Sequence, residues 1–599
     1  MIYHCEDHTC NYWDEGEKLP ERCPQCGRKL LRANEADMTG DDWTALGNTL
    51  WDAEASDKKR MVDCFRKAAY LGSAWGVCNL GICMEQGNGV EADPVQAFWL
   101  YQQAVEMGSL NAVCCLGVCY QYGIGTAPDA KQAAELYCKA AEYGSPRGQM
   151  LLARAFHDGI GVEADAAEAV YWVRAAAYQR YGEGMHRLGV CYEYGDGVEQ
   201  NWERAVHWFR EAAESGVGVA MTDLGYCYEK GCGVEQSWEQ AFSWYRRGAE
   251  CGYPVSMSNL GLCYKRGYGV DQNWQEAIKW YEQGAQCGDL QSMHNLACCY
   301  EGGEGVEQNE DRAFYWYRRS AEGGNGSAMC NLGRCYKRGY GVEQNWQEAV
   351  KWYEQGAQCG NLQSMHNLAC CYEHGEGVEQ NMTEAIRWYT AAAEGGNADA
   401  MHDLGWHYDH GEGVEQDMKK AICWYERAAE QNHPAAMNSL GECYAMGRGV
   451  PRDLETAMEW YRRAAELGEA MADYNMGWHL EQAGKLSEAY THYRKAADGN
   501  DDSAWWALGR FYENGVVVAQ DGKEARRCYE TGEKLGSVKC KMRLARCKLL
   551  GIGGRRAKKA GLDLCRQALE LAKESSEKED YGYEAEMNLL RRTIAENES

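Results

Sequence analysis

The sequence predicts an all-α fold, a superhelical α-solenoid of about fifteen helix-turn-helix repeats with a small module at its N-terminus. A Leu-Gly pair, or a Leu-Ala or Met-Gly variant, recurs along the chain, and every step from Leu80 to Met476 is 36 residues. Fixed periods of about 20–50 residues are typical of solenoids. The composition agrees, because 39 Tyr and 22 Trp beside only 7 Phe indicate one short pattern copied many times.

The N-terminal segment, residues 1–33, differs from the repeats. It carries Cys5, Cys10, Cys23 and Cys26, and the last pair lies in a Cys-Pro-Gln-Cys-Gly sequence that resembles the knuckle of zinc ribbons and rubredoxin-like sites. We expect these four thiolates to hold one structural Zn ion, with His8 as the alternative to Cys10 and iron as the alternative metal. A disulfide-stapled module is less favoured, because the first residues lack the basic segment and apolar stretch of a secretory signal.

The first residue of each recurring pair serves here as the marker of its repeat. Steps outside the regular stretch are 34, 32 and 36 residues long, and the total is fifteen repeats. The markers are Leu46, Leu80, Leu116, Leu152, Leu188, Leu224, Leu260, Leu296, Leu332, Leu368, Leu404, Leu440, Met476, Leu508 and Leu544.

Each repeat is expected to contain two amphipathic helices. Leu260 and Tyr264 are four residues apart and share the face of a first helix, and Gly267 and Gly269 interrupt the chain after it. A second stripe with four-residue spacing follows, and Asn273 with a glutamate three residues on predicts a capping box where that second helix starts. The stripe consists of Ala277, Tyr281 and Ala285.

Three further features of the repeats concern helix packing, loop length and duplication. Gly261, beside the marker, costs about 1 kcal/mol of helix propensity, so we expect it to permit close approach of the two helices. The 32-residue step after Met476 indicates an inter-helix loop shortened by four residues, with both helices kept. Residues 256–309 and 328–381 match at all but seven of 54 positions, which indicates a duplicated two-repeat block.

The recurring pattern, Leu-Gly-x-x-Tyr, Gly-x-Gly-Val and Ala-x-x-x-Tyr over 36 residues, resembles Sel-1-like repeats (SLR), relatives of the tetratricopeptide repeat. The resemblance covers about residues 40–573. We expect three parts: the zinc-ribbon-like module at 1–33, the Sel-1-like solenoid at 38–573 and a C-terminal capping helix within 574–599. The family resemblance implies a protein-interaction scaffold.

Charge and motifs exclude several classes of function. The net charge of −28 disfavours binding of nucleic acid by the surface as a whole, and no stretch of about 18 uncharged apolar residues could span a membrane. None of the common hydrolase, metalloprotease or nucleotide-binding motifs is present, so we expect no enzymatic activity. The expected location is the cytoplasm.

By resemblance to tetratricopeptide arrays, residues two before, two after and five after the marker line a concave face. Five residues after the marker, acids predominate, and we expect them to be solvated and to attract a basic segment of a partner. A His/Cys/Glu set with this helical spacing could bind metal, but exposed, variable groove residues are the favoured interpretation. Asparagines directly before the marker either hold a peptide backbone or, as we favour, tie adjacent repeats together. The predicted partner-binding residues are His294, Glu301, His366, Glu373, His402, Trp406 and Asp409.

The C-terminal repeats carry a net positive charge, unlike the rest of the chain. Residues 523–573 contain fifteen Lys and Arg against five Asp and Glu. We favour a polar cap on the last repeat. The alternative is an anionic partner, either the acidic solenoid of another copy of the chain or nucleic acid. Nucleic acid would make the chain a nucleic-acid-associated adaptor using its zinc ribbon and this basic patch. The patch consists of Arg543, Arg546, Arg555, Arg556, Lys558 and Lys559. A last helix near 581–597 is expected to seal the array with Met587, Leu590 and Ile594.

Overall fold

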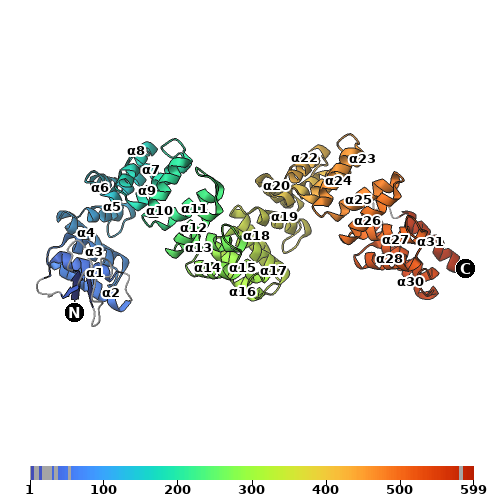
Figure 1. Cartoon of the computed structure of the whole chain (residues 1–599), viewed down its shortest axis with the longest axis horizontal. Helices are drawn as coiled ribbons and strands as arrows, with labels where there is room; N and C mark the ends of the chain where they lie inside the picture. Colours follow the sequence, from blue (N-terminus) through green and yellow to red (C-terminus); the bar gives the residue numbers. More distant parts are fainter. Residues whose placement is uncertain are drawn as a thin grey trace. The chain divides into compact units, whose positions relative to one another are not determined.

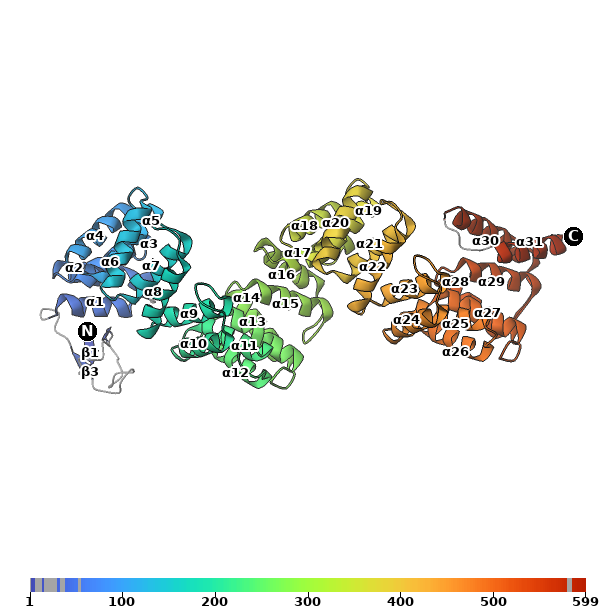
Figure 2. The same cartoon turned by 90° about the horizontal axis from the view of Figure 1, so that it is seen from above.

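The computed structural model describes residues 2–5, 13–15, 30–32, 38–51, 55–578 and 584–598. The chain divides into two compact units, Met1–Gln308 and Asn309–Ser599, each of which is described by itself. Both are built from helical hairpins stacked in sequence order (Figures 1 and 2).

The N-terminal segment contributes a small antiparallel sheet in the order β2-β1-β3. Its strands are β1 (Ile2–Cys5), β2 (Trp13–Glu15) and β3 (Leu30–Arg32), and Tyr3 of β1 pairs with Asp14 and Arg32. Of the expected zinc ligands, Cys5 ends β1, while Cys10, Cys23 and Cys26 lie outside the described residues, as does His8. The zinc ribbon therefore stays a prediction.

Two helices fall in each sequence repeat of the first unit, the odd-numbered one carrying the marker. The helices are α1 (Gly40–Thr49), α2 (Ala55–Tyr70), α3 (Ala74–Gln86), α4 (Pro94–Glu106), α5 (Leu110–Tyr122), α6 (Ala130–Glu142), α7 (Pro146–Asp158), α8 (Ala166–Tyr178), α9 (Gly182–Tyr194), α10 (Trp202–Glu214), α11 (Gly218–Lys230), α12 (Trp238–Glu250), α13 (Pro254–Arg266), α14 (Trp274–Gln286) and α15 (Leu290–Gly302).

The second unit continues the same alternation, which confirms the all-α solenoid. Its helices are α16 (Glu310–Glu322), α17 (Gly326–Arg338), α18 (Trp346–Gln358), α19 (Leu362–His374), α20 (Met382–Gly395), α21 (Ala398–His410), α22 (Met418–Glu430), α23 (Pro434–Met446), α24 (Leu454–Glu466), α25 (Ala470–Gln482), α26 (Leu486–Asp498), α27 (Asp502–Asn514), α28 (Gly522–Lys534), α29 (Val538–Leu550), α30 (Lys558–Lys578) and α31 (Glu584–Glu598).

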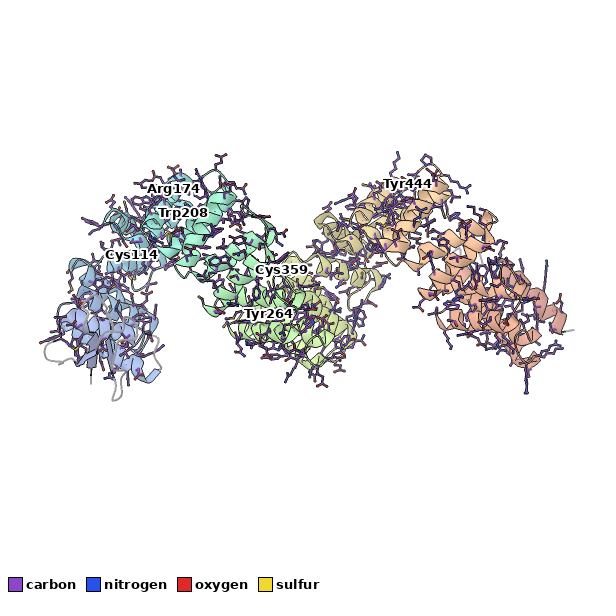
Figure 3. All side chains as sticks on the ribbon, viewed as in Figure 1. Cys114, Arg174, Trp208, Tyr264, Cys359 and Tyr444 are labelled. Atoms are coloured by element: carbon purple, nitrogen blue, oxygen red, sulfur yellow. The ribbon has the colours of Figure 1, made fainter. Side chains whose placement is uncertain are left out.

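The apolar stripes form the core of each hairpin as the spacing predicts. Leu260 of α13 and Tyr281 of α14 are fully buried. A Cβ on Gly261 would lie 2.5 Å from the Tyr281 ring, so this glycine does permit the close helix approach. Tyr264, labelled in Figure 3, is half-buried and meets Phe242 of the preceding repeat edge to face at 5.4 Å.

Polar side chains fix the helix starts and tie neighbouring repeats together. The Asn273 side chain accepts the backbone N–H of Glu276 at 3.1 Å, which is the N-cap half of the predicted box. Asn79, directly before its marker, donates to the Asn48 side chain of the preceding repeat at 2.8 Å. Asn475 donates to Asn438 at 3.0 Å in the same way, so the favoured role of these asparagines, joining repeats, is confirmed at both positions.

The shortened repeat has the form that its length predicts. Only residues 483–485 separate α25 from α26, whereas residues 267–273 separate α13 from α14, and both helices keep their full length. The loop thus lacks four residues.

The next loop contains an unusual left-handed residue. Val517 has φ +63° and is 48% exposed, whereas its counterparts in the other long loops, such as Gly269 and Gly341, are glycines. A β-branched side chain is strained at positive φ. We expect Val517→Gly to raise the free energy of unfolding by about 1 kcal/mol, measured by urea denaturation, even though glycine loses more backbone entropy on folding. A loss of stability would contradict this account.

The last helix packs on the final hairpin. Met587 and Leu590 of α31 are buried in one cluster with Met542 and Leu549 of α29, and Ile594 packs against it. The predicted sealing face of this helix therefore contacts the end of the array.

Candidate protein-interaction site

A buried tyrosine recurs on the second helix of most repeats, 21 residues after the marker in the 36-residue repeats. Eleven such tyrosines are less than 2% exposed, including the counterpart in the shortened repeat. They are Tyr101, Tyr137, Tyr245, Tyr281, Tyr317, Tyr353, Tyr389, Tyr425, Tyr461, Tyr493 and Tyr529.

The hydroxyl of this tyrosine often donates to the acid five residues after the marker. Tyr245 donates to Glu229 at 2.8 Å, and burial together with that carboxylate raises the pKa of Tyr245 far above its usual range. The other pairs are Tyr101 with Glu85 at 2.6 Å, Tyr389 with Glu373 at 2.6 Å, Tyr493 with Glu481 at 2.7 Å and Tyr529 with Glu513 at 2.8 Å. We call this contact the tyrosine–acid lock.

The lock corrects the expectation that these acids form a solvated stripe. Asp409 departs furthest from it, since its side chain is 4% exposed and pairs with Arg448 at 3.0 Å. Glu373 also lies 3.7 Å from His407, a buried side chain. The acids are internal hydrogen-bond acceptors first, because a hydroxyl that leaves water needs a partner.

The predicted partner-binding residues lie on three first helices. His294 and Glu301 belong to α15 in the first unit, and the other five belong to α19 and α21 in the second. All except Asp409 are half-buried. These residues therefore form two groups, one in each unit.

In the second group, histidines of adjacent repeats converge on one carboxylate. His366 Nε2 lies 2.9 Å from one oxygen of Asp403, and His402 Nδ1 lies 3.0 Å from the other. Burial lowers the pKa of His366, but the hydrogen bonds with Asp403 and Cys370 outweigh it and raise this pKa to about 10. Asp403, directly before its marker, was not among the predicted site residues.

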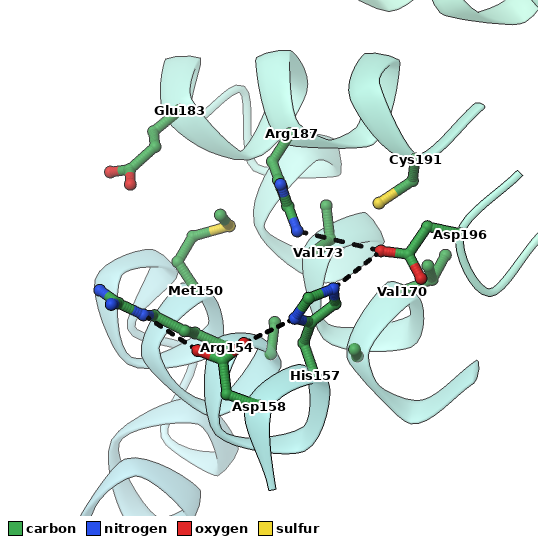
Figure 4. Close-up of a pocket in the computed structure, with 12 residues that line it drawn as sticks. Met150, Arg154, His157, Asp158, Val170, Val173, Glu183, Arg187, Cys191 and Asp196 are labelled. Carbon is green, nitrogen blue, oxygen red and sulfur yellow. Dashed lines mark hydrogen bonds and ion pairs between the residues drawn. The ribbon is translucent and has the colours of Figure 1, made fainter. Parts of the chain in front are cut away.

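A pocket of about 260 Å³ opens in the first unit among α7, α8 and α9 (Figure 4). The apolar part of its wall includes Met150, Val170 and Val173, and Cys191 adds a thiol. Arg154, Arg187 and Glu183 supply charges around it.

The pocket lies in a repeat that has neither the tyrosine nor the acid of the tyrosine–acid lock. Val173 stands 21 residues after Leu152, at the tyrosine position, and His157 stands at the position of the acid. Both residues line the pocket. The smaller Val173 side chain leaves open the space that a tyrosine ring fills in most other repeats.

His157 organises the polar side of the pocket. Its two ring nitrogens lie 2.7 Å from Asp158 and 3.2 Å from Asp196. The hydrogen bond from His157 lowers the pKa of Asp158. None of these pocket residues was among the predicted site residues, although the departure of Val173 from the Ala-x-x-x-Tyr motif is a signal for the pocket in the sequence.

The residues of the predicted basic patch fall into two groups, those that contact other residues of the chain and those that are exposed. Arg543 pairs with Glu513 at 3.3 Å and with Glu586 at 2.7 Å, and Arg546 also pairs with Glu513. Arg556 donates to the backbone of Leu549. The two half-buried arginines of the patch thus bind acids of the chain itself. Arg555, Lys558 and Lys559 are exposed.

Two solved structures are similar to this chain in sequence. A protective antigen of uropathogenic Escherichia coli with an SLR fold is 32% identical, with a TM-score of 0.51 over 75% of this chain and 97% of that one. A Sel1 repeat protein from Oxalobacter formigenes is 31% identical over 41% of this chain and 96% of its own, with a TM-score of 0.38. No curated protein matches.

Within the part of the chain that the structure describes, no helix is both long and apolar enough to cross a bilayer. The family model for the Sel1 repeat matches thirteen consecutive segments between residues 76 and 537. Matches of this extent, in phase with the helix pairs, place the chain in the Sel1 repeat family.

Proposed function

We propose that this protein is a non-enzymatic scaffold in the cytoplasm that binds a segment of a partner protein, with the pocket at Val173 as the anchor point. The pocket carries this proposal, because it combines an apolar wall with polar groups at the one repeat where valine replaces the buried tyrosine. Anchors that fill such pockets supply much of the energy of protein–protein binding.

The pocket favours an aromatic side chain from the partner. Most other repeats place their own tyrosine ring in the equivalent space, so the shape suits a Tyr or Phe side chain entering from outside. Since residues outside 523–573 carry a net charge of about −38, basic residues flanking this anchor would be attracted. The partner segment is therefore expected to be basic with one aromatic anchor.

The test restores the lock that this repeat lacks. The double variant Val173→Tyr/His157→Glu should fill the pocket and preserve the fold. Ala153 is compatible with a tyrosine at 173, because Ala297 stands opposite Tyr317 at the equivalent positions. A displayed random-peptide library selected on the full chain should yield peptides with one aromatic and several basic residues. Their affinity for the double variant should fall at least tenfold.

Phe209→Tyr is the matched control, since it also introduces the family tyrosine but at a position that is already filled. Binding should be unchanged in this variant. Selected peptides that are acidic, lack an aromatic residue or bind the double variant with unchanged affinity would contradict the proposal.

A further inference from the structure

Three ligand-type side chains meet between the hairpins of two adjacent repeats in the second unit. His366 and Cys370 are four residues apart on α19 and therefore share a face, and Asp403 reaches them from α21. One ligand atom from each lies within 4.8 Å of the other two. Among the side chains that the structure describes, no second group of three meets this criterion.

The separations are close to those of a tetrahedral site. His366 Nε2 lies 2.9 Å from Asp403 Oδ2 and 3.9 Å from Cys370 Sγ. Zinc–ligand distances of about 2.0–2.3 Å place neighbouring ligand atoms about 3.3–3.6 Å apart. Small side-chain movements would therefore bring all three atoms to one ion.

The surrounding groups orient these ligands. The Tyr389 hydroxyl, which donates to Glu373, lies 3.3 Å from the Cys370 sulfur, and His402 holds the second oxygen of Asp403 at 3.0 Å. The Gln363 amide lies 3.3 Å from the other ring nitrogen of His366. Outer contacts of this kind fix ring and carboxylate orientation in metal sites.

We propose that His366, Cys370 and Asp403 bind one Zn²⁺ ion that clamps α19 to α21. Imidazole, thiolate and carboxylate together suit Zn²⁺ better than Mg²⁺ or Ca²⁺, which prefer oxygen ligands alone. Three protein ligands leave the fourth position to a water molecule. The site is separate from the N-terminal cysteines and from the pocket at Val173.

Two other repeats provide internal comparisons. His294 and Cys298 repeat the pair on α15, with nitrogen and sulfur 3.8 Å apart, but Asn331 stands at the sequence position that corresponds to Asp403. His186 lies 2.7 Å from Asp223, but Val190 stands at the cysteine position. Only the repeat at 362–397 combines all three ligands with its neighbour.

The experiment measures Zn²⁺ per chain on the full-length protein, after chelation and reloading, by elemental analysis and by competition with a chromophoric chelator. Cys370→Val and Asp403→Asn should each bind one ion fewer than the unmodified chain. Val190→Cys should bind one ion more, because it completes the His186–Asp223 pair. Any Zn²⁺ that the N-terminal cysteines bind adds equally to the measured Zn²⁺ per chain in all variants.

Cys298→Val is the matched control and should leave the stoichiometry unchanged. If Cys370→Val and Cys298→Val change the stoichiometry equally, or neither Cys370→Val nor Asp403→Asn changes it, the site does not exist. Circular dichroism checks the fold, and valine already occupies the cysteine position at Val190. If Cys370→Val nevertheless unfolds, Asp403→Asn alone decides whether the site exists. This variant should fold, because asparagine stands directly before the marker in several repeats.

Discussion

Gly269→Ala is expected to destabilise the first unit by about 3 kcal/mol, although alanine is generally the more stabilising residue. Gly269 has φ +69°, and a Cβ there would lie 2.2 Å from the backbone oxygen of Trp238, at the start of α12 in the preceding repeat. The left-handed conformation costs a non-glycine residue about 1 kcal/mol or more, and the clash with a rigid backbone adds a similar amount or more. Urea denaturation and hydrogen exchange of the α12 and α13 amides measure the loss.

Gly288→Ala is the control for this prediction. Gly288 has φ +88°, but nothing lies within 4 Å of its Cβ position, so only the conformational cost of about 1 kcal/mol applies. Other repeats carry Arg180, Asn432 and Asn500 at the equivalent position with positive φ. Equal losses in the two variants would show that contact between repeats plays no part.

Asp409→Lys should destabilise the second unit by about 3 kcal/mol. The substitution places an ammonium group beside Arg448 at a side chain that is 4% exposed and leaves that arginine only its longer, 3.8 Å contact with Glu442. Breaking a largely buried ion pair typically costs about 3–5 kcal/mol, and the partial exposure of Arg448 puts this pair at the lower end. Urea denaturation at low and high salt provides the measurement.

Glu426→Lys makes the same change of charge at an exposed position of α22 and should alter stability by less than about 0.5 kcal/mol. If Asp409→Lys is equally mild, the carboxylate is solvated as first expected. A stability loss has a practical consequence: combined charge reversal at Glu301, Glu373 and Asp409 would damage the fold before it reported on partner binding. The pocket variants are therefore the better test of function.

The sequence alone determined the architecture, because each repeat contacts mainly its neighbours and repeats one local pattern. The 36-residue period located helix pairs, Gly261 indicated close helix approach, and the 32-residue step indicated a loop shortened by four residues. All three follow from local spacing. The sequence also determined the family, through the same motif.

The tertiary structure decided which of the predicted side chains are available to bind a partner. Helical spacing placed Glu373 and Asp409 on the first-helix face, but the partners Tyr389 and Arg448 lie 16 and 39 residues further along the chain. The sequence places Arg543 in the basic patch, but only the structure shows that it pairs with Glu513 and Glu586.

The pocket and the proposed ion site also depend on contacts that only the tertiary structure shows. His366 and Cys370 were visible as a helical pair, but Asp403 joins them from the next repeat. Val173 was visible as a departure from the motif, but only packing of α7, α8 and α9 turns a smaller side chain into an open space. Periodicity determines which residues face inward, whereas contacts between repeats decide which of those positions are filled, paired or left open.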